Sequence, residues 1–239
     1  MTADAGLNIL VTGGSGASGI AAARALRAAG HRVFAVGSDR DRIDAAASKA
    51  GDGVTPLVCD LAAADAVREL HSALAADGVR MGGVVHLVGG WRGGHGIPDQ
   101  TDEDWDFLER GSVTTLRNVS RTFFDDLAAS PRGRFAMVSS TTVEKPTAAL
   151  ANYAAAKAAA EAWTMAMADG FRRAAEAGKG DAAAVILVVK ALVDDEIRRK
   201  HPERSFPGAT DVADLAAAVV RLFAQPAAAL NGTRIRLAP

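Results

Sequence analysis

The sequence predicts a single α/β domain built on a doubly wound, seven-stranded parallel sheet with helices on both faces. Two observations lead to this fold class. Short runs rich in Val, Ile and Leu alternate along the chain with longer, alanine-rich amphipathic stretches, which is the pattern of successive βαβ units. A glycine-rich turn also separates the first apolar run from the first amphipathic stretch. The chain of 239 residues contains no repeat or linker, so we expect one domain over residues 1–239.

The apolar runs supply the strands of this predicted sheet. They cover residues 7–11, 31–36, 54–59, 83–88, 134–139, 183–189 and 233–237. The helices predicted between them cover residues 18–29, 40–50, 63–76, 101–129 and 150–177, with a last helix that ends at residue 224. Caps support these boundaries: Gly30 after the first helix, Thr101 with Asp104 at the fourth, and Asp211 at the last. Charged residues 194–208 indicate a mobile loop or short helix, inside a predicted substrate loop or lid at 190–209.

The composition excludes several classes of function. Lys and Arg number 27 against 28 acids, so there is no basic field to attract nucleic acid or an anionic membrane. The apolar runs are too short and too interrupted to cross a bilayer, and the first residues lack the features of a signal peptide. The single Cys59 excludes an internal disulfide and a cysteine-based metal cluster, and we predict no metal site. We therefore expect a cytoplasmic protein that acts on a small molecule.

The most informative stretch contains Tyr153, which is the only tyrosine of the chain, and Lys157. Residues four apart share a helix face, so the ammonium can lie beside the phenol. A neighbouring cation favours the phenolate and lowers the pKa of a tyrosine, which makes it a proton donor and acceptor near neutral pH. Ser140 lies thirteen residues upstream, directly after an apolar strand, and can reach the same point. The Tyr-Lys pair alone is also common as an ordinary surface pair.

The glycine turn has the spacing G-x-x-G-x-x-G at Gly13, Gly16 and Gly19. Glycines permit a tight turn, and the following helix offers free N–H groups to a pyrophosphate. The predicted contacts to a dinucleotide are Gly13, Ser15, Gly16, Ala17 and Gly19. An ordinary Gly/Ser loop is the alternative. The sequence argues against a P-loop, because no Gly-Lys-Ser/Thr follows.

The end of the second strand indicates which dinucleotide is bound. An acid there binds the ribose 2′-hydroxyl of NAD, and a base accepts the 2′-phosphate of NADP. Gly37 occupies the position of the acid, whereas Ser38 and Arg40 suit a phosphate. Asp39 argues for the reverse. We expect NADP(H) to be favoured, with NAD(H) as the alternative.

With the glycine turn, Ser140, Tyr153 and Lys157 in order, the chain resembles the short-chain dehydrogenase/reductase family over residues 7–237. The resemblance implies a Rossmann-type fold and an NAD(P)-dependent oxidoreductase that interconverts a carbonyl and an alcohol by hydride transfer. It implies that Tyr153 is the general acid and base. Lys157 then lowers the pKa of the tyrosine and holds the nicotinamide ribose, and Ser140 hydrogen-bonds the substrate oxygen.

Further roles and some departures follow from this resemblance. Asp60, with Leu61, lies at the position of the adenine-contacting aspartate, and Val88 and Gly89 match the end of the Asn-Asn-Ala-Gly motif. Ser112 aligns with the fourth catalytic residue, which is usually asparagine. The departures are His86-Leu87 in place of Asn-Asn, Lys190-Ala191 in place of Pro-Gly, and Asn231-Gly-Thr in place of Asp-Gly-Gly.

Two alternative functions stay open. The run Gly89-Gly-Trp-Arg-Gly-Gly94 resembles the dihydropteridine reductase branch, which suggests a pteridine- or quinone-type reductase, although Ser140 points to ordinary carbonyl reduction. The departures from the family pattern suggest instead a non-catalytic protein that binds or senses dinucleotides.

Loops beyond the carboxyl ends of the strands form the substrate walls in this fold class. Here they are residues 91–98, 141–150 and 191–208. The predicted substrate contacts are Trp91, Arg92, Thr142 and Leu192. Trp91 either stacks on a planar substrate or packs under its own loop, and we expect His86 to satisfy a buried hydrogen bond. The resemblance also implies a homodimer or homotetramer through the 101–129 and 150–177 helices.

Overall fold

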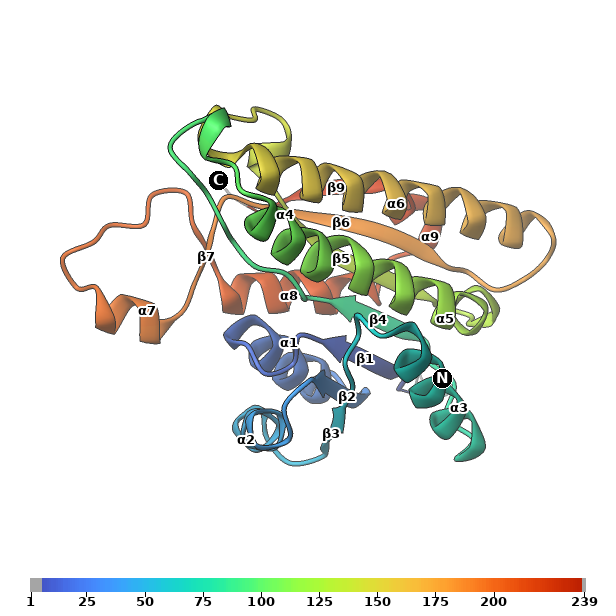
Figure 1. Cartoon of the computed structure of the whole chain (residues 1–239). Helices are drawn as coiled ribbons and strands as arrows, with labels where there is room; N and C mark the ends of the chain where they lie inside the picture. Colours follow the sequence, from blue (N-terminus) through green and yellow to red (C-terminus); the bar gives the residue numbers. More distant parts are fainter. Residues whose placement is uncertain (1–5, 238–239) are drawn as a thin grey trace.

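The computed structural model describes residues 6–237 and contains the predicted doubly wound sheet (Figure 1). The signal-peptide prediction concerns the first residues, and residues 1–5 lie outside the described part, as do residues 238–239. Seven parallel strands follow the order β3-β2-β1-β4-β5-β6-β9. The strands are β1 (Asn8–Thr12), β2 (Arg32–Gly37), β3 (Val54–Val58), β4 (Gly83–His86), β5 (Arg134–Ser140), β6 (Ala183–Val189) and β9 (Thr233–Arg236). The strand order reverses between β1 and β4, and folds of this type bind ligands at that point.

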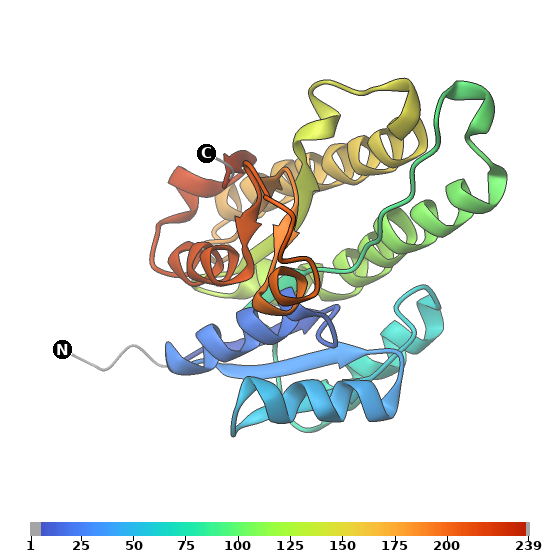
Figure 2. The same cartoon turned by 90° about the vertical axis from the view of Figure 1, so that its left-hand side faces the viewer.

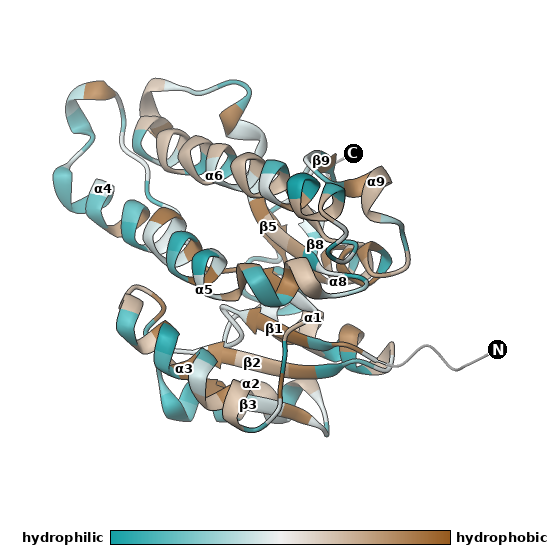
Figure 3. Ribbon diagram, turned by 90° about the vertical axis from the view of Figure 1, so that its right-hand side faces the viewer, coloured by the Kyte–Doolittle hydropathy of each residue, from teal (hydrophilic) through white to brown (hydrophobic). Residues whose placement is uncertain are grey.

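Helices cover both faces of the sheet. One face carries α1 (Ala17–Ala28), α2 (Arg40–Ala50) and α8 (Val212–Leu222); the other carries α3 (Ala64–Ala76), α5 (Thr115–Ala129) and α6 (Ala151–Glu176). The strands alternate between two buried clusters: in β6, Val185 and Leu187 face α1 and α8, whereas Ile186 and Val188 face α5 and α6. Figure 3 shows the strands as largely hydrophobic ribbons between helices of mixed character. Burial on both faces explains why the strand sequences are continuous apolar runs.

The helix boundaries follow from the caps that the sequence indicates. Gly30, with φ of 88°, ends α1 in a Schellman motif, in which Gly30 N donates to Arg27 O and His31 N donates to Leu26 O. Thr101 Oγ1 accepts from Asp104 N at the start of α4 (Asp102–Glu109), as predicted. Asp211 Oδ1 accepts from Ala213 N at the start of α8, so this predicted cap is also confirmed.

The helix predicted for residues 101–129 is interrupted by one π-helical turn. This turn, Arg110–Thr114, separates α4 from α5. Thr115, the first residue of α5, donates from its Oγ1 to Gly111 O of this turn at 2.7 Å. Such turns insert an extra residue into a helix and often occur at functional sites. Here the turn brings Gly111 close to Gly89, where the ideal Cβ position of Gly111 lies 3.7 Å from Gly89 Cα.

The segment after β6 leaves the body of the sheet and returns to it (Figure 1). It contains β7 (Leu192–Val193), α7 (Asp195–Lys200) and β8 (Thr210–Asp211), and β7 pairs with β8 in a small parallel sheet. The segment predicted as a loop or short helix thus contains a short helix, α7, followed by a loop that leads to β8. Lys190 Nζ donates to Pro207 O at 2.9 Å and ties the returning chain to the end of β6. A short helix before the last strand, α9 (Ala227–Leu230), was not expected from the sequence.

Within residues 6–237, no helix combines the length and the apolar character that a membrane span requires.

Candidate active site

The last residues of β5 hold one face of helix α6. Lys157 Nζ donates to the carbonyl oxygen of Val138 at 3.1 Å, and Ser139 Oγ donates to the carboxylate of Glu161. Ser140 hydrogen-bonds Tyr153. Tyr153, Lys157 and Glu161 are four residues apart and share one face of α6. Each of three successive helical turns therefore contacts the end of β5. The structure thus brings Ser140, Tyr153 and Lys157 together, as the sequence suggested.

The electrostatics of Tyr153 differ from the prediction. Burial raises the pKa of the phenol above its ordinary value of 10.0, and hydrogen bonding with Ser140 opposes this rise only in part. The expected lowering by Lys157 is therefore wrong for the protein without a ligand. The physical reason is that the phenol is largely desolvated, while the ammonium of Lys157 is bonded to the Val138 carbonyl.

Lys157 is buried, and burial lowers the pKa of its amine from 10.5 to about 8. The carboxylate of Glu161, one helical turn away, acts in the opposite direction. The amine points to Gly89, because a Cβ placed on this glycine would lie 3.2 Å from Lys157 Nζ. A larger residue at 89 would therefore press on the lysine.

Ser112 lies on the other side of the same glycine. Its Oγ is 3.7 Å from the Cβ position of Gly89. It is buried and has no hydrogen-bond partner among the described residues. A buried hydroxyl without a partner is costly and calls for an explanation. The π-helical turn thus brings Ser112 to the same glycine as Lys157, at the place that the resemblance assigned to the fourth catalytic residue.

His86 is a satisfied core histidine, as predicted. Its Nδ1 lies 2.9 Å from Thr12 Oγ1 and its Nε2 lies 3.2 Å from Thr115 Oγ1. Because Thr115 donates its hydroxyl proton to Gly111 O, His86 Nε2 is the donor to Thr115 and Nδ1 is the acceptor. Complete burial, with a smaller effect of the Lys157 charge, lowers the pKa of His86 to about 3. The imidazole is neutral and supports the π-helical turn.

A cleft of about 760 Å³ opens at the glycine turn. Predicted residues that line it are Gly13, Ser15, Gly16, Ser38, Asp60, Leu61, Val88 and Gly89. Gly13 has φ of 72°, and a Cβ on Gly19 would lie 2.4 Å from Gly13 O. The Cβ of a residue at 16 would meet nothing nearer than Gly13 O at 3.6 Å. These glycines therefore make a tight turn that leaves room for a ligand, which fits a dinucleotide pyrophosphate. Ala17 begins helix α1 beside this turn.

Beside the start of α2, where the sequence predicts the ribose, the cleft differs in one residue from the prediction. Ser38, Asp39 and Arg42 line the cleft, whereas Arg40 forms an exposed ion pair with Asp44 at 3.7 Å. Asp39 Oδ1 accepts from Arg42 N as the N-cap of α2. Both arginines belong to α2, and the helical twist directs Arg42, not Arg40, to the cleft. The sequence prediction relied on the position after the second strand, which does not distinguish the two.

At Asp60, which the resemblance assigns to the adenine, the cleft contains an ion pair that joins distant parts of the chain. Arg110 Nη2 lies 2.7 Å from Asp60 Oδ2, and Asp60 Oδ1 accepts from Ala62 N. Phe107 also lines the cleft, with its ring beside Gly90. Arg110 and Phe107 were missed in the sequence, because no local pattern connects them with Asp60, some fifty residues away.

A second cavity of about 480 Å³ adjoins the cleft and contains Tyr153 and Lys157. The predicted contacts Trp91 and Leu192 line it, and Trp91 is 63% exposed, so its ring is available to a ligand. Arg92 and Thr142 are not among its lining residues. The guanidinium of Arg92 lies 4.0 Å from the centre of the Phe107 ring and pairs with Asp104, and Thr142 hydrogen-bonds Ser140.

Gln100 fastens the first turn of α6, which has no side-chain cap of its own. Its Oε1 accepts from Asn152 N at 3.0 Å, and its Nε2 donates to the carbonyl oxygens of Ala148 and Ala149 at 3.3 Å each. The loops before α4 and α6 therefore lie together at one end of the molecule, as Figure 2 shows. These hydrogen bonds of Gln100 fix the backbone of Asn152, the residue before Tyr153.

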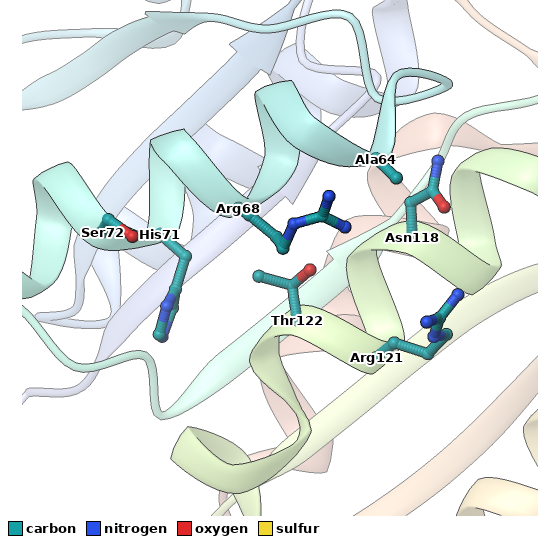
Figure 4. Close-up of a pocket in the computed structure, with 7 residues that line it drawn as sticks. All are labelled: Ala64, Arg68, His71, Ser72, Asn118, Arg121 and Thr122. Atoms are coloured by element: carbon teal, nitrogen blue, oxygen red, sulfur yellow. The ribbon is translucent and has the colours of Figure 1, made fainter.

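Another groove, of about 340 Å³, lies between α3 and α5 (Figure 4). Two of its polar side chains already have partners, because Arg68 pairs with Asp65 and His71 Nε2 lies 3.4 Å from Asp126 Oδ2. The groove shares no lining residue with the cleft or with the cavity of Tyr153. We therefore place the candidate active site at Ser140, Tyr153 and Lys157.

Comparison with solved structures supports the fold over nearly the whole chain. An NADPH-bound short chain oxidoreductase from Pseudomonas aeruginosa PAO1, described as containing an atypical catalytic center, is 21% identical, with a TM-score of 0.83 and coverage of 97% of this chain and 95% of the other. A gluconate 5-dehydrogenase from Burkholderia cenocepacia J2315, in complex with NADP and tartrate, is 22% identical, with a TM-score of 0.82 and coverage of 98% and 94%. An NAD⁺-bound xylitol dehydrogenase has a TM-score of 0.83 at 18% identity and covers 98% of each chain.

Comparison of sequences reveals the family. Nodulation protein G of Rhizobium meliloti is 30% identical over 153 residues, which are 64% of this chain and 62% of that protein's length. An acetoacetyl-CoA reductase of Shinella zoogloeoides is 28% identical over 196 residues, or 82% of this chain and 77% of the reductase. The family model described as short chain dehydrogenase matches residues 7–175. The chain belongs to the short-chain dehydrogenase/reductase family.

Proposed function

We propose that this protein is an NAD(P)-dependent oxidoreductase that interconverts a small-molecule carbonyl and an alcohol, with Tyr153 as general acid and base. The observation that carries the proposal is the position of Tyr153 and Lys157 in a cavity that adjoins the glycine-turn cleft, with the buried Ser140 hydrogen-bonded to Tyr153. Family membership and the acetoacetyl-CoA reductase relative support the same class of reaction.

A bound dinucleotide would supply or accept the hydride. In reduction, Tyr153 gives its proton to the carbonyl oxygen, and in oxidation it takes the proton back. The Ser140 hydroxyl donates a hydrogen bond to the same oxygen, where negative charge develops. The buried Lys157 amine favours the tyrosinate when it is charged. The hydroxyl of Ser112 suits one water between itself and the lysine, since it has no other partner among the described residues.

We propose NADP(H) as the favoured cofactor. Arg42 and Ser38 line the cleft next to the start of α2, and their guanidinium and hydroxyl suit a 2′-phosphate. The carboxylate of Asp39 is engaged as the cap of α2, which weakens its claim to a ribose 2′-hydroxyl. Michaelis constants for the two cofactors decide the matter, and a strong preference for NAD(H) would overturn this assignment.

The function is tested by a screen of NADPH and NADH consumption with ketones, quinones and a quinonoid pterin. We expect turnover of a ketone and its loss in Tyr153→Phe, because phenylalanine removes only the proton donor. Full turnover by Tyr153→Phe on a confirmed substrate would refute the acid role. Calorimetric binding of a dinucleotide with no turnover of any compound would favour a non-catalytic binding protein, and turnover of the pterin alone would favour the pteridine branch.

We further propose a cytoplasmic homodimer or homotetramer in which residues 190–209 close over the substrate. The support for an assembly is the apolar side chains along α5 and α6: a groove of about 420 Å³ contains Phe124, Trp163 and Met167, and elsewhere on α6 Met165 is 44% exposed. Light scattering that finds a monomer at micromolar concentration would contradict the assembly.

A further inference from the structure

Glu161 is a buried carboxylate that neither the sequence motifs nor the proposed chemistry uses. It lies on α6 four residues after Lys157 and is 8% exposed. Buried carboxylates are rare unless they are paired and hydrogen-bonded. Its position one helical turn after the lysine of the candidate site therefore needs an explanation.

Two elements other than α6 hold this carboxylate. Ser139 of β5 donates its hydroxyl to Glu161 Oε1. Arg234 of β9 lies with its Nε 2.9 Å from Glu161 Oε2 and its Nη2 3.2 Å from Oε1. Both carboxylate oxygens are thus engaged, and the geometry is fixed from two strands.

The same arginine also binds a second carboxylate. Arg234 Nη1 lies 2.9 Å from Oε1 of Glu144, and Arg236 pairs with the other oxygen of Glu144. Glu144 follows Ser140 in the loop before α6 and has 35% of its side chain exposed. The chain therefore offers two carboxylates on one arginine, one buried below Lys157 and one at the surface.

The surroundings of Lys157 contain few other charges. The titratable or charged groups that face it are Tyr153 and Glu161 from α6, His86 from β4 and, beyond Glu161, Arg234 from β9. Lys190, directly after β6, lines the same cavity, and its Nζ donates to Pro207 O. His86 is neutral, because its pKa lies near 3. Val138 of β5 supplies only a carbonyl oxygen. Glu161 is the carboxylate of this set, and it is held by Ser139 and Arg234.

We propose that Glu161 is a positioning residue of the candidate site: fixed by Ser139 and Arg234, it acts as the counter-charge that keeps the buried Lys157 protonated beside Tyr153. The role rests on the proposed function, because a charged lysine is what the tyrosine chemistry needs. Burial acts against the ammonium, and a nearby carboxylate is the group that offsets this effect.

The test measures the pKa of Lys157 directly in the full-length protein, by ¹H–¹³C NMR with ¹³Cε-labelled lysine, and identifies the signal by its loss in Lys157→Arg. We expect Glu161→Gln to lower the lysine pKa by about one unit, because the amide keeps the shape but not the charge. Glu144→Gln, which removes the exposed carboxylate from the same arginine, leaves the lysine pKa unchanged. An unchanged value in Glu161→Gln, or an equal fall in Glu144→Gln, would overturn the proposal.

A second variant gives a shift of the opposite sign. Arg234→Gln, on the last strand of the sheet, removes the cation that partly neutralises Glu161, so we expect the Lys157 pKa to rise by about half a unit. A fall or no change would overturn the proposal even if Glu161→Gln does not fold. The NMR titration needs neither substrate nor dinucleotide. Failure of the proposed function would show instead as absence of turnover in the wild-type protein.

Discussion

The Nζ atom of Lys157 donates a hydrogen bond to the carbonyl oxygen of Val138 at 3.1 Å and so joins the helix of the tyrosine to the end of the central strand β5. Together with Ser139–Glu161 and Ser140–Tyr153, this bond sets the position of α6 along the strand. It also directs the lysine to Gly89 and away from a direct bond with the phenol. The consequences for titration, stability and binding can be measured.

The first prediction concerns the titration of Tyr153. Because burial raises the pKa of this phenol, we expect its midpoint to lie above 10.0 in the protein without ligand. Tyr153 is the only tyrosine of the chain, so tyrosinate absorbance at 295 nm reports it alone. A midpoint near neutral pH would show that the charge of Lys157 outweighs burial.

The second prediction separates two buried serines. Ser112→Ala removes a hydroxyl without a partner among the described residues, so stability stays equal or rises by up to about 1 kcal/mol, while turnover falls. Ser120→Ala is the control. Ser120 Oγ accepts from Trp163 Nε1 at 2.8 Å, and its loss leaves a donor unpaired at a cost of about 1–3 kcal/mol. Denaturant unfolding and steady-state rates measure both effects, and equal destabilisation would contradict the difference.

The third prediction separates folding from binding in the glycine turn. In Gly19→Ala the new Cβ would lie 2.4 Å from Gly13 O, so we expect a lower Tm. In Gly16→Ala the nearest atom is 3.6 Å away, so the Tm stays unchanged, but the methyl group enters the cleft and weakens dinucleotide binding. Thermal unfolding and NADPH fluorescence measure the two effects. Unchanged NADPH affinity in Gly16→Ala would place the pyrophosphate elsewhere.

The fourth prediction concerns the cost of burying Lys157. Its folded pKa of about 8 lies below the ordinary 10.5, so between these values the unfolded chain binds more protons and stability rises with pH. Below pH 8 burial of the charged lysine lowers the free energy of unfolding by its full amount, about 3 kcal/mol. This is a net value that already includes the hydrogen bond to Val138. Lys157→Met removes this cost.

We therefore expect Lys157→Met to be more stable than the wild type at pH 7, with the difference shrinking between pH 8 and 10.5. Urea unfolding across this pH range measures it. Lys145→Met, which removes an exposed lysine, is the control for the loss of an amine. Parallel stability curves for the wild type and Lys157→Met would show that burial does not shift this pKa.

The fifth prediction tests the ribose end of the cleft. Arg42→Ala weakens NADPH binding by about tenfold and hardly affects NADH, because a charge-assisted bond to a phosphate contributes about 1.5 kcal/mol or more. Arg40→Ala, whose guanidinium pairs with Asp44 outside the cleft, changes neither affinity. Fluorescence titration with both nucleotides gives the result. Equal weakening for both nucleotides in Arg42→Ala would remove the 2′-phosphate from this site.

Much of the fold could be predicted from the sequence, because its signals are local. Strands buried on both faces need continuous apolar runs, and helix ends need caps such as Thr101 and Asp211, so both leave marks within a few residues. Ser140, Tyr153 and Lys157 were recognised for the same reason: helical spacing and position after a strand place them together.

Only the tertiary structure decided the relations between distant residues. Three such relations depend on how the helices rotate and pack against the sheet. Asp60 pairs with Arg110, Arg42 and not Arg40 lines the cleft, and Ser112 and Lys157 both lie next to Gly89. The direction of the Tyr153 pKa shift also belongs here. Burial is a property of the whole packed molecule, and at this tyrosine it outweighs the effect expected from a lysine four residues away.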